Sequence, residues 1–172
     1  MNEIQTLKDT GTELSDEVDA DTNVFMVIVD DTPEAANALR YACNRARNRR
    51  GRVALLRVVE PQDFTHFLTV GEKVAAEGEA AARDLLQSLS EEVTERSGAE
   101  PIYFIEHGEV QQTVIRTLTE HPEVSIFVLA AASGSNPGPL IGALANRIIN
   151  QVRTPIVLVP GELTLEEVDA IS

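Results

Sequence analysis

Continuous apolar segments alternate with amphipathic segments along the chain, and this alternation limits the fold more than any other feature. An apolar run without polar interruption is typical of a strand buried on both faces of a parallel sheet. Five predominantly apolar runs of strand length occur, at Val24–Asp30, Arg52–Glu60, Ile102–Glu106, Val124–Ala131 and Pro155–Pro160. Strands that alternate with helices predict an α/β fold, with an open five-stranded parallel sheet and helices on both faces.

The segments between these strands have apolar residues at helical spacing. Thr32 and Pro33 have the residue types of an N-cap and a first helical position, and Gly51 is expected to end that helix. We expect residues 61–70 to form a loop before one long helix. The remaining helices are expected over residues 71–98, 108–122 and 140–152.

The chain has 172 residues and a formal net charge of −14, which is unevenly distributed. Residues 1–22 carry −6 and residues 161–172 carry −4, which leaves −4 for residues 23–160. We therefore expect one α/β domain over residues 23–160 between two acidic, solvated tails, of which the N-terminal one is flexible. An acidic chain repels phosphate backbones, so nucleic acid is not an expected partner.

Membrane and secretory features are not recognisable in the sequence. The longest apolar candidate, Val124–Ala132, is too short to cross a bilayer, and the N-terminal residues lack the pattern of a signal peptide. Cys43 is the single cysteine, so an intrachain disulfide is excluded, and we expect its side chain to be small and buried. These features favour a cytoplasmic location without membrane contact.

Ligands of open parallel sheets bind beyond the carboxyl ends of the strands, where the strand order reverses. This rule selects Asp30–Asp31, Val58–Glu60 and Ala131–Pro139. The last of these begins the segment SGSNPGPLIGAL, Ser133–Leu144. Its backbone N–H groups at a helix start could bind an anion. Alternatively, the segment is a structural turn, because its prolines supply no N–H and suit a helix start.

Four segments, in this order, resemble the universal stress protein family: VFMVIVDDTPEAANAL, LLRVVE, GEVQQTVIRTLTEHPEVSIFVLA and IGALANRIINQVRTPIVLVP. The resemblance covers about residues 23–160. It implies a Rossmann-like sheet of the adenine-nucleotide-alpha-hydrolase type, a role in stress response, and ATP or AMP as ligand. It also implies a homodimer paired through the last strand, here Ile156, Val157, Leu158 and Val159.

The family's nucleotide pattern, G-x2-G-x9-G followed by Ser or Thr, is only partly present. Gly142 matches its final glycine, and Ala143 stands where the hydroxyl residue is found. Ala130 takes the place of the first glycine. The second glycine of the pattern falls near Ser133. Gly134 and Gly138 lie close to that position, but their spacing differs from that of the pattern.

Two further positions match residues of the family's adenine site. Asp30 matches the acid near the ribose, although an acid there could instead cap the following helix. Val58 matches the position whose backbone meets the adenine edge, and it is a core strand residue in either interpretation. The resemblance therefore implies a nucleotide site formed by Asp30, Val58, Ser133, Gly134, Gly138, Gly142 and Ala143.

No nucleophile–base set, paired acids or metal-ligand spacing is recognisable, so at most weak ATP hydrolysis is expected and no metal is assigned. Two functions remain open. The chain could be a homodimeric binding or regulatory module for unknown protein partners, with a degenerate adenine-nucleotide site and no certain cofactor. It could instead bind ATP or AMP through a rearranged Ser133–Gly142 loop.

Overall fold

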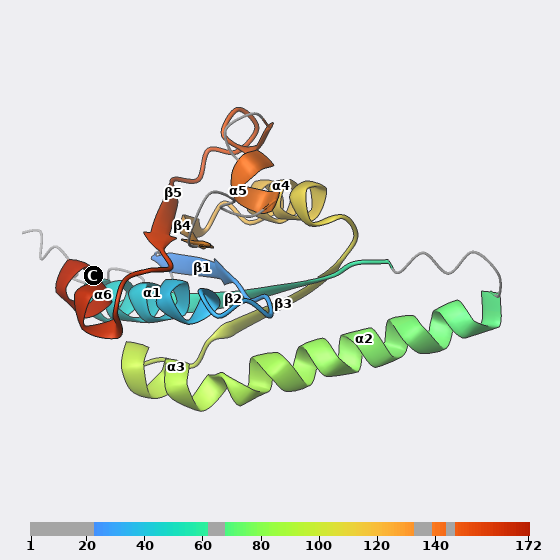
Figure 1. Cartoon of the computed structure of the whole chain (residues 1–172), viewed down its shortest axis with the longest axis horizontal. Helices are drawn as coiled ribbons and strands as arrows, with labels where there is room; N and C mark the ends of the chain where they lie inside the picture. Colours follow the sequence, from blue (N-terminus) through green and yellow to red (C-terminus); the bar gives the residue numbers. More distant parts are fainter. Residues whose placement is uncertain (1–22, 62–67, 133–138, 144–146) are drawn as a thin grey trace, which may run out of the picture.

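The structure, a computed structural model, describes residues 23–61, 68–132, 139–143 and 147–172. Its centre is a sheet of five parallel strands in the order β3-β2-β1-β4-β5 (Figure 1). The strands are β1 (Val24–Ile28), β2 (Arg52–Val59), β3 (Ile102–His107), β4 (Val124–Ala131) and β5 (Ile156–Pro160). All five lie within one or two residues of the predicted segments, so the predicted fold class is confirmed.

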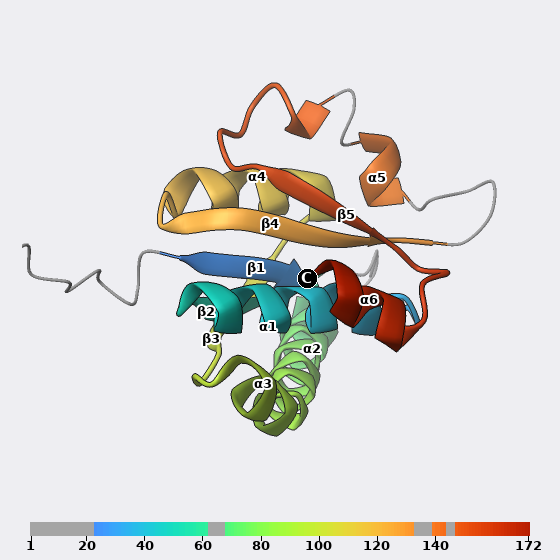
Figure 2. The same ribbon diagram turned by 90° about the vertical axis from the view of Figure 1, so that its left-hand side faces the viewer.

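Helices cover both faces of the sheet (Figure 2). One face carries α1 (Ala35–Arg49), α2 (Leu68–Ser88), α3 (Ser90–Ser97) and α6 (Leu165–Ile171). The other carries α4 (Val110–Glu120) and α5 (Pro139–Ala143). None of the described helices is long and apolar enough to cross a membrane.

The two faces of β1 enter two separate hydrophobic cores, which is why all five residues of this strand are apolar. Phe25 and Val27 pack toward α1, whereas Met26 and Ile28 pack toward α4. Every residue of β1 is buried. Because side chains alternate along a strand, a central parallel strand under two helical layers needs apolar residues throughout.

The predicted helix over residues 71–98 is wrong in its continuity and its start. Helix α2 begins at Leu68, within the expected loop, and the chain breaks at Leu89 before α3. The Ser88 hydroxyl donates to the carbonyl of Leu85 at 2.7 Å. A serine that bonds to the preceding turn bends a helix, and this contact lies directly before the break.

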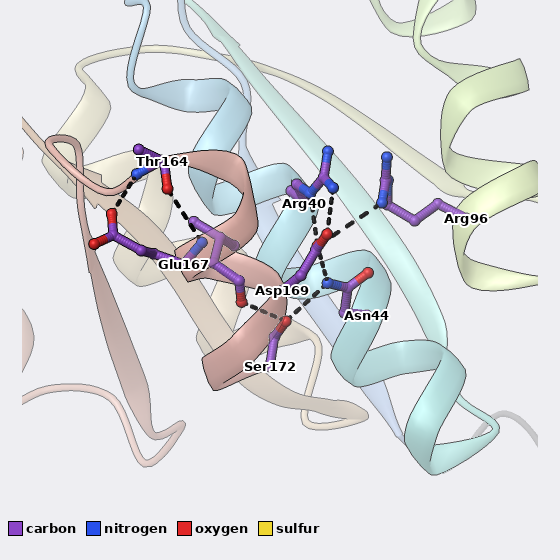
Figure 3. Close-up of polar contacts among 8 residues, drawn as sticks. Arg40, Asn44, Arg96, Thr164, Glu167, Asp169 and Ser172 are labelled. Atoms are coloured by element: carbon purple, nitrogen blue, oxygen red, sulfur yellow. Dashed lines mark hydrogen bonds and ion pairs between the residues drawn. The ribbon is translucent and has the colours of Figure 1, made fainter.

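The C-terminal segment is not the solvated acidic tail that the charge distribution predicts. Residues Leu165–Ile171 form α6, which lies against α1 (Figures 1 and 3). Thr164 and Glu167 form a reciprocal capping box at its start, and Val168 is fully buried. The predicted N-terminal tail, residues 1–22, lies outside the described residues. The limits of the α/β domain therefore remain a proposal.

The other helix ends also differ from expectation. Helix α1 starts at Ala35, with Glu34 at the N-cap position and no side-chain cap. Of the helix expected over residues 140–152, the structure describes α5 (Pro139–Ala143) and a further helical part at residues 147–148. Residues 144–146 lie outside the described part of the chain, and residues 149–151 form a turn.

Candidate functional site

A cavity of about 370 Å³ opens at the carboxyl ends of β1, β2 and β4. The strand order reverses between β1 and β4, so this is the position where open α/β sheets bind ligands. The volume lies at the small end of the ~300–1,000 Å³ typical of small-molecule sites. The described lining also includes residues from the starts of α1, α4 and α5.

One wall of the cavity is apolar. It is formed by residues from three strands or strand ends and from two helices, namely Ile28, Val58, Leu129, Val110, Leu140 and Ile141. Such a wall suits a flat apolar ring or an aliphatic group. The predicted position of Val58 in the site is consistent with this lining.

The backbone of Val58 also faces the cavity side of β2. The Leu56 carbonyl accepts from Val29 N–H at 2.8 Å, which directs the backbone groups of Leu56 toward β1. Backbone groups alternate sides along a strand, so those of Val58 point the same way. The β1–β2 pairing ends at Ile28 and Leu56, so the Val58 groups extend past the last paired residue.

Asp30 lies in the cavity lining, where its side chain organises the loop after β1. Its Oδ1 accepts from the backbone N–H of Thr32 at 3.1 Å and from the Thr32 hydroxyl at 2.5 Å. The alternative that Asp30 caps α1 is wrong, because Glu34 occupies the N-cap position. A carboxylate has a second oxygen, so Asp30 can accept a further hydrogen bond from a ligand.

Arg57 is a cavity residue that the sequence analysis missed. Its guanidinium donates to the carbonyl of Val29 at 3.0 Å and to the Asp31 carboxylate at 2.7 Å. The Arg57 side chain is 22% exposed, whereas that of Asp31 is 78% exposed. The available signal was a charged residue near the end of the strand RVALLRVV, whose other charged residue, Arg52, stands at its start.

Glu109, a second missed residue, occupies the start of α4 beside the cavity. Its carboxylate accepts from the backbone N–H groups of Gln111 at 3.2 Å and Gln112 at 2.9 Å. An acid at this position is stabilised by the helix dipole and by otherwise unpaired N–H groups. Its sequence signal was an acid immediately before a helical pattern.

The described lining is strongly acidic. It contains one arginine, Arg57, and five carboxylate residues, which are Asp30, Asp31, Glu34, Glu60 and Glu109. The formal charge of these side chains is therefore −4. Within the described parts of the chain, no three His, Cys, Asp or Glu residues are close enough to hold a metal ion together.

The other predicted nucleotide residues are only partly described. Gly142 is exposed on α5, and Ala143 is 8% exposed. Neither lines the cavity as described, although their neighbours Leu140 and Ile141 do. The predicted residues Ser133, Gly134 and Gly138 lie outside the described residues.

The residues predicted to pair two subunits lie on β5, an edge strand of the described sheet. Leu158 is 47% exposed, and Ile156 and Val157 are half-buried. Val159 is 1% exposed because it belongs to the core on the α1 face.

Comparison with known proteins gives one family match and several structural matches. The family model "Universal stress protein family" matches residues 22–160. No curated protein sequence matches the chain significantly. A universal stress protein UspA from Lactobacillus plantarum is 20% identical with a TM-score of 0.67, and the alignment covers 80% of this chain and 97% of that one.

Two similar structures are complexes with a nucleotide. A universal stress protein in complex with cAMP has a TM-score of 0.54 at 15% identity, over 80% of this chain and 96% of that one. A universal stress protein from Archaeoglobus fulgidus in complex with dAMP has a TM-score of 0.52 at 18% identity, and the alignment covers 78% of this chain and 94% of that one. The likenesses agree with the fold, and the family match extends over most of the sequence. The chain therefore belongs to the universal stress protein family.

Proposed function

We propose that this protein is a homodimeric binding or regulatory module of the stress response, with a degenerate adenine-nucleotide site. The observation that carries this proposal is the cavity at the place where the strand order reverses, between β1 and β4. Asp30 and Val58 lie in its lining together with four further carboxylate residues. Such a lining disfavours a triphosphate.

The sequence of the phosphate loop supports a degenerate site. Ala143 lacks the hydroxyl of the family pattern, and Ala130 replaces its first glycine. The segment from Ala131 to Asn146 contains no lysine, arginine or histidine. A loop of this composition can offer a phosphate backbone N–H groups and neutral side chains only.

Native mass spectrometry of freshly purified protein, with and without ATP and AMP, tests the proposal. We expect a dimer that carries no ATP at millimolar concentration of the nucleotide. A dimer that retains ATP at this concentration would contradict the degenerate site. It would support the second candidate, a nucleotide-binding member that uses a rearranged Ser133–Gly142 loop. The cAMP and dAMP complexes of similar proteins favour that candidate.

The proposed dimer pairs β5 of two subunits, because an apolar edge strand invites pairing. Phe127 N–H donates to the carbonyl of Pro155, so residues 155, 157 and 159 direct their backbone groups toward β4. The N–H of Leu158 therefore points away from β4, toward the open edge.

This geometry allows a matched pair of variants. Leu158→Pro removes the outward N–H and leaves the β4 pairing in place, so we expect a monomer by light scattering. Leu158→Ala keeps the N–H group and should remain a dimer. A wild-type monomer at micromolar concentration would contradict the proposed dimer, whatever the ligand result.

A cytoplasmic location completes the proposal, on the ground that the single Cys43 leaves no intrachain disulfide to form. At most weak ATP hydrolysis is proposed. Turnover that disappears in Asp30→Ala would be the sign of such an activity.

A further inference from the structure

The cavity contains two features that ordinarily bind anions, and in this chain an internal carboxylate occupies each of them. The first is the start of α4, where backbone N–H groups and the helix dipole favour negative charge. Glu109 accepts from two of these N–H groups, those of Gln111 and Gln112. A phosphate group would have to displace this carboxylate.

The second feature is Arg57, the one cation among the described lining residues. Its guanidinium is held by the Asp31 carboxylate at 2.7 Å and by the Val29 carbonyl at 3.0 Å. An arginine that is paired in this way contributes little positive potential to a ligand. Glu34 and Glu60 add negative charge without a cationic partner in the described lining.

In the described structure, no three of these acids lie close enough together to hold a metal ion by themselves. Carboxylates accept hydrogen bonds from hydroxyl and amino groups. The same lining also contains apolar residues, among them Ile28, Val58 and Leu129. The combination suits a flat ring with hydroxyl donors and no negative charge.

We infer that the cavity takes an uncharged nucleoside and discriminates against the corresponding nucleotides. This inference rests on the proposed function, since the purine part of the ligand comes from the degenerate adenine site. It goes further in naming the ligand class that the remaining site would accept. The carboxylates select by charge: a ligand phosphate meets repulsion, whereas the ribose hydroxyls meet acceptors such as Asp30.

Isothermal titration of the full chain with adenosine, AMP and ATP tests the inference. We expect adenosine to bind about tenfold or more tightly than AMP, and ATP to bind most weakly, because each phosphate adds like-charge repulsion. Raising the salt from about 0.05 to about 0.5 M should strengthen AMP binding through screening, with little effect on adenosine.

Two variants separate charge selection from other causes. Asp31→Asn removes a carboxylate and releases Arg57, so the ratio of the AMP to the adenosine dissociation constant should fall several-fold. Glu60→Gln should lower this ratio in the same direction. Asp84→Asn, an exposed acid on α2 outside the cavity lining, is the matched control and should leave the ratio unchanged. Circular dichroism checks that each variant is folded.

Binding of AMP or ATP as tight as that of adenosine would overturn the inference, and with it the degenerate site. Failure of all three ligands to bind at millimolar concentration would also overturn it. In that case the homodimeric module would stand, because native mass spectrometry measures the dimer independently of any nucleoside.

Discussion

Arg40 of α1 holds Asp169 of α6 through two hydrogen bonds from its guanidinium (Figure 3). The Nε group donates to Oδ1 at 2.6 Å, and a second guanidinium nitrogen donates to Oδ2. Asn44 donates to the same carboxylate at 2.8 Å, and Arg96 of α3 lies 4.0 Å away. The hydrogen bonds from Arg40, followed by that from Asn44, hold the pKa of Asp169 well below its ordinary range.

This lowered pKa predicts an acid-sensitive contribution of Asp169 to stability. The folded state favours the ionised carboxylate, so the stabilisation is complete above the ordinary pKa of about 4. It is lost as the pH falls below that value, because the unfolded chain binds the proton first. Asp169→Asn should lower the free energy of unfolding at neutral pH, and the difference from wild type should shrink toward about pH 3. Urea denaturation of both proteins at neutral pH and at about pH 3 measures this difference in the free energy of unfolding.

Asp84→Asn is the control for this comparison, since the side chain of Asp84 is exposed on α2. Its difference from wild type should be small and nearly independent of pH. An Asp169→Asn difference that stays constant between neutral and acid pH would show that the carboxylate is not ionised preferentially in the fold.

Burial of Val168 predicts that α6 is an integral part of the fold. Its side chain is 0% exposed and packs in the core on the α1 face. Val168→Ala should lower the free energy of unfolding by about 1–3 kcal/mol, from lost burial and a residual cavity. Ile171→Ala on the same helix is the control, because Ile171 is 55% exposed. Equal effects of the two variants in urea denaturation would contradict a docked α6.

The sequence was sufficient to predict the sheet, because strands buried on both faces leave a clear pattern in the sequence. Strands such as Val24–Ile28 are buried on both faces, and this requirement appears directly as an uninterrupted apolar run. The segments that line the cavity were selected by the rule that open parallel sheets bind ligands beyond the carboxyl ends of their strands. Asp30 and Val58 could be assigned to one cavity for the same reason.

Helix α6 was missed because its acids suggested a solvated tail. The sequence TLEE, Thr164–Glu167, contains a capping-box pattern that could have revealed it. What the sequence cannot show is the partner of each acid. The ion pair between Arg40 and Asp169 joins residues 129 positions apart. The Arg57–Asp31 pair is likewise a product of the fold, and with it the charge balance of the cavity.

Gly51 packs directly against the backbone of Asn23, so we expect any side chain at position 51 to lower the free energy of unfolding. A Cβ at this position would lie 2.1 Å from the backbone oxygen of Asn23, next to the start of β1. Gly51→Ala should therefore destabilise the fold by about 1–3 kcal/mol, since backbone must move.

Gly142→Ala is the matched control for Gly51→Ala. Its added Cβ meets no atom of the described residues within 4 Å. Because alanine is favoured over glycine in a helix by about 0.5–1 kcal/mol, Gly142→Ala should leave the free energy of unfolding unchanged or raise it slightly. Urea denaturation of both variants measures the contrast. Similar destabilisation by the two alanines would mean that space at Gly51 is not limiting.

Cys43, the single cysteine, is buried on α1, so we expect its thiol to react slowly and its reaction rate to measure how often the surrounding core opens. Its side chain is 0% exposed on α1, which confirms the expected burial. Burial raises the pKa of the thiol to about 12, and the negative charge of Glu92 acts in the same direction. Because only the thiolate is nucleophilic, the folded protein should react with a disulfide reagent at about pH 8 far more slowly than a free cysteine of ordinary pKa, about 8.5.

Full reaction of one thiol per chain in urea is the internal control for this measurement, since unfolding exposes the side chain. In the folded state, the rate of the thiol reaction should be limited by opening of the core around α1 and should not depend on the concentration of the reagent. Val168→Ala, which weakens the same core, should raise that rate, whereas Ile171→Ala should leave it close to wild type. A wild-type thiol that reacts as fast as the unfolded control would contradict the packing of α1 against the sheet.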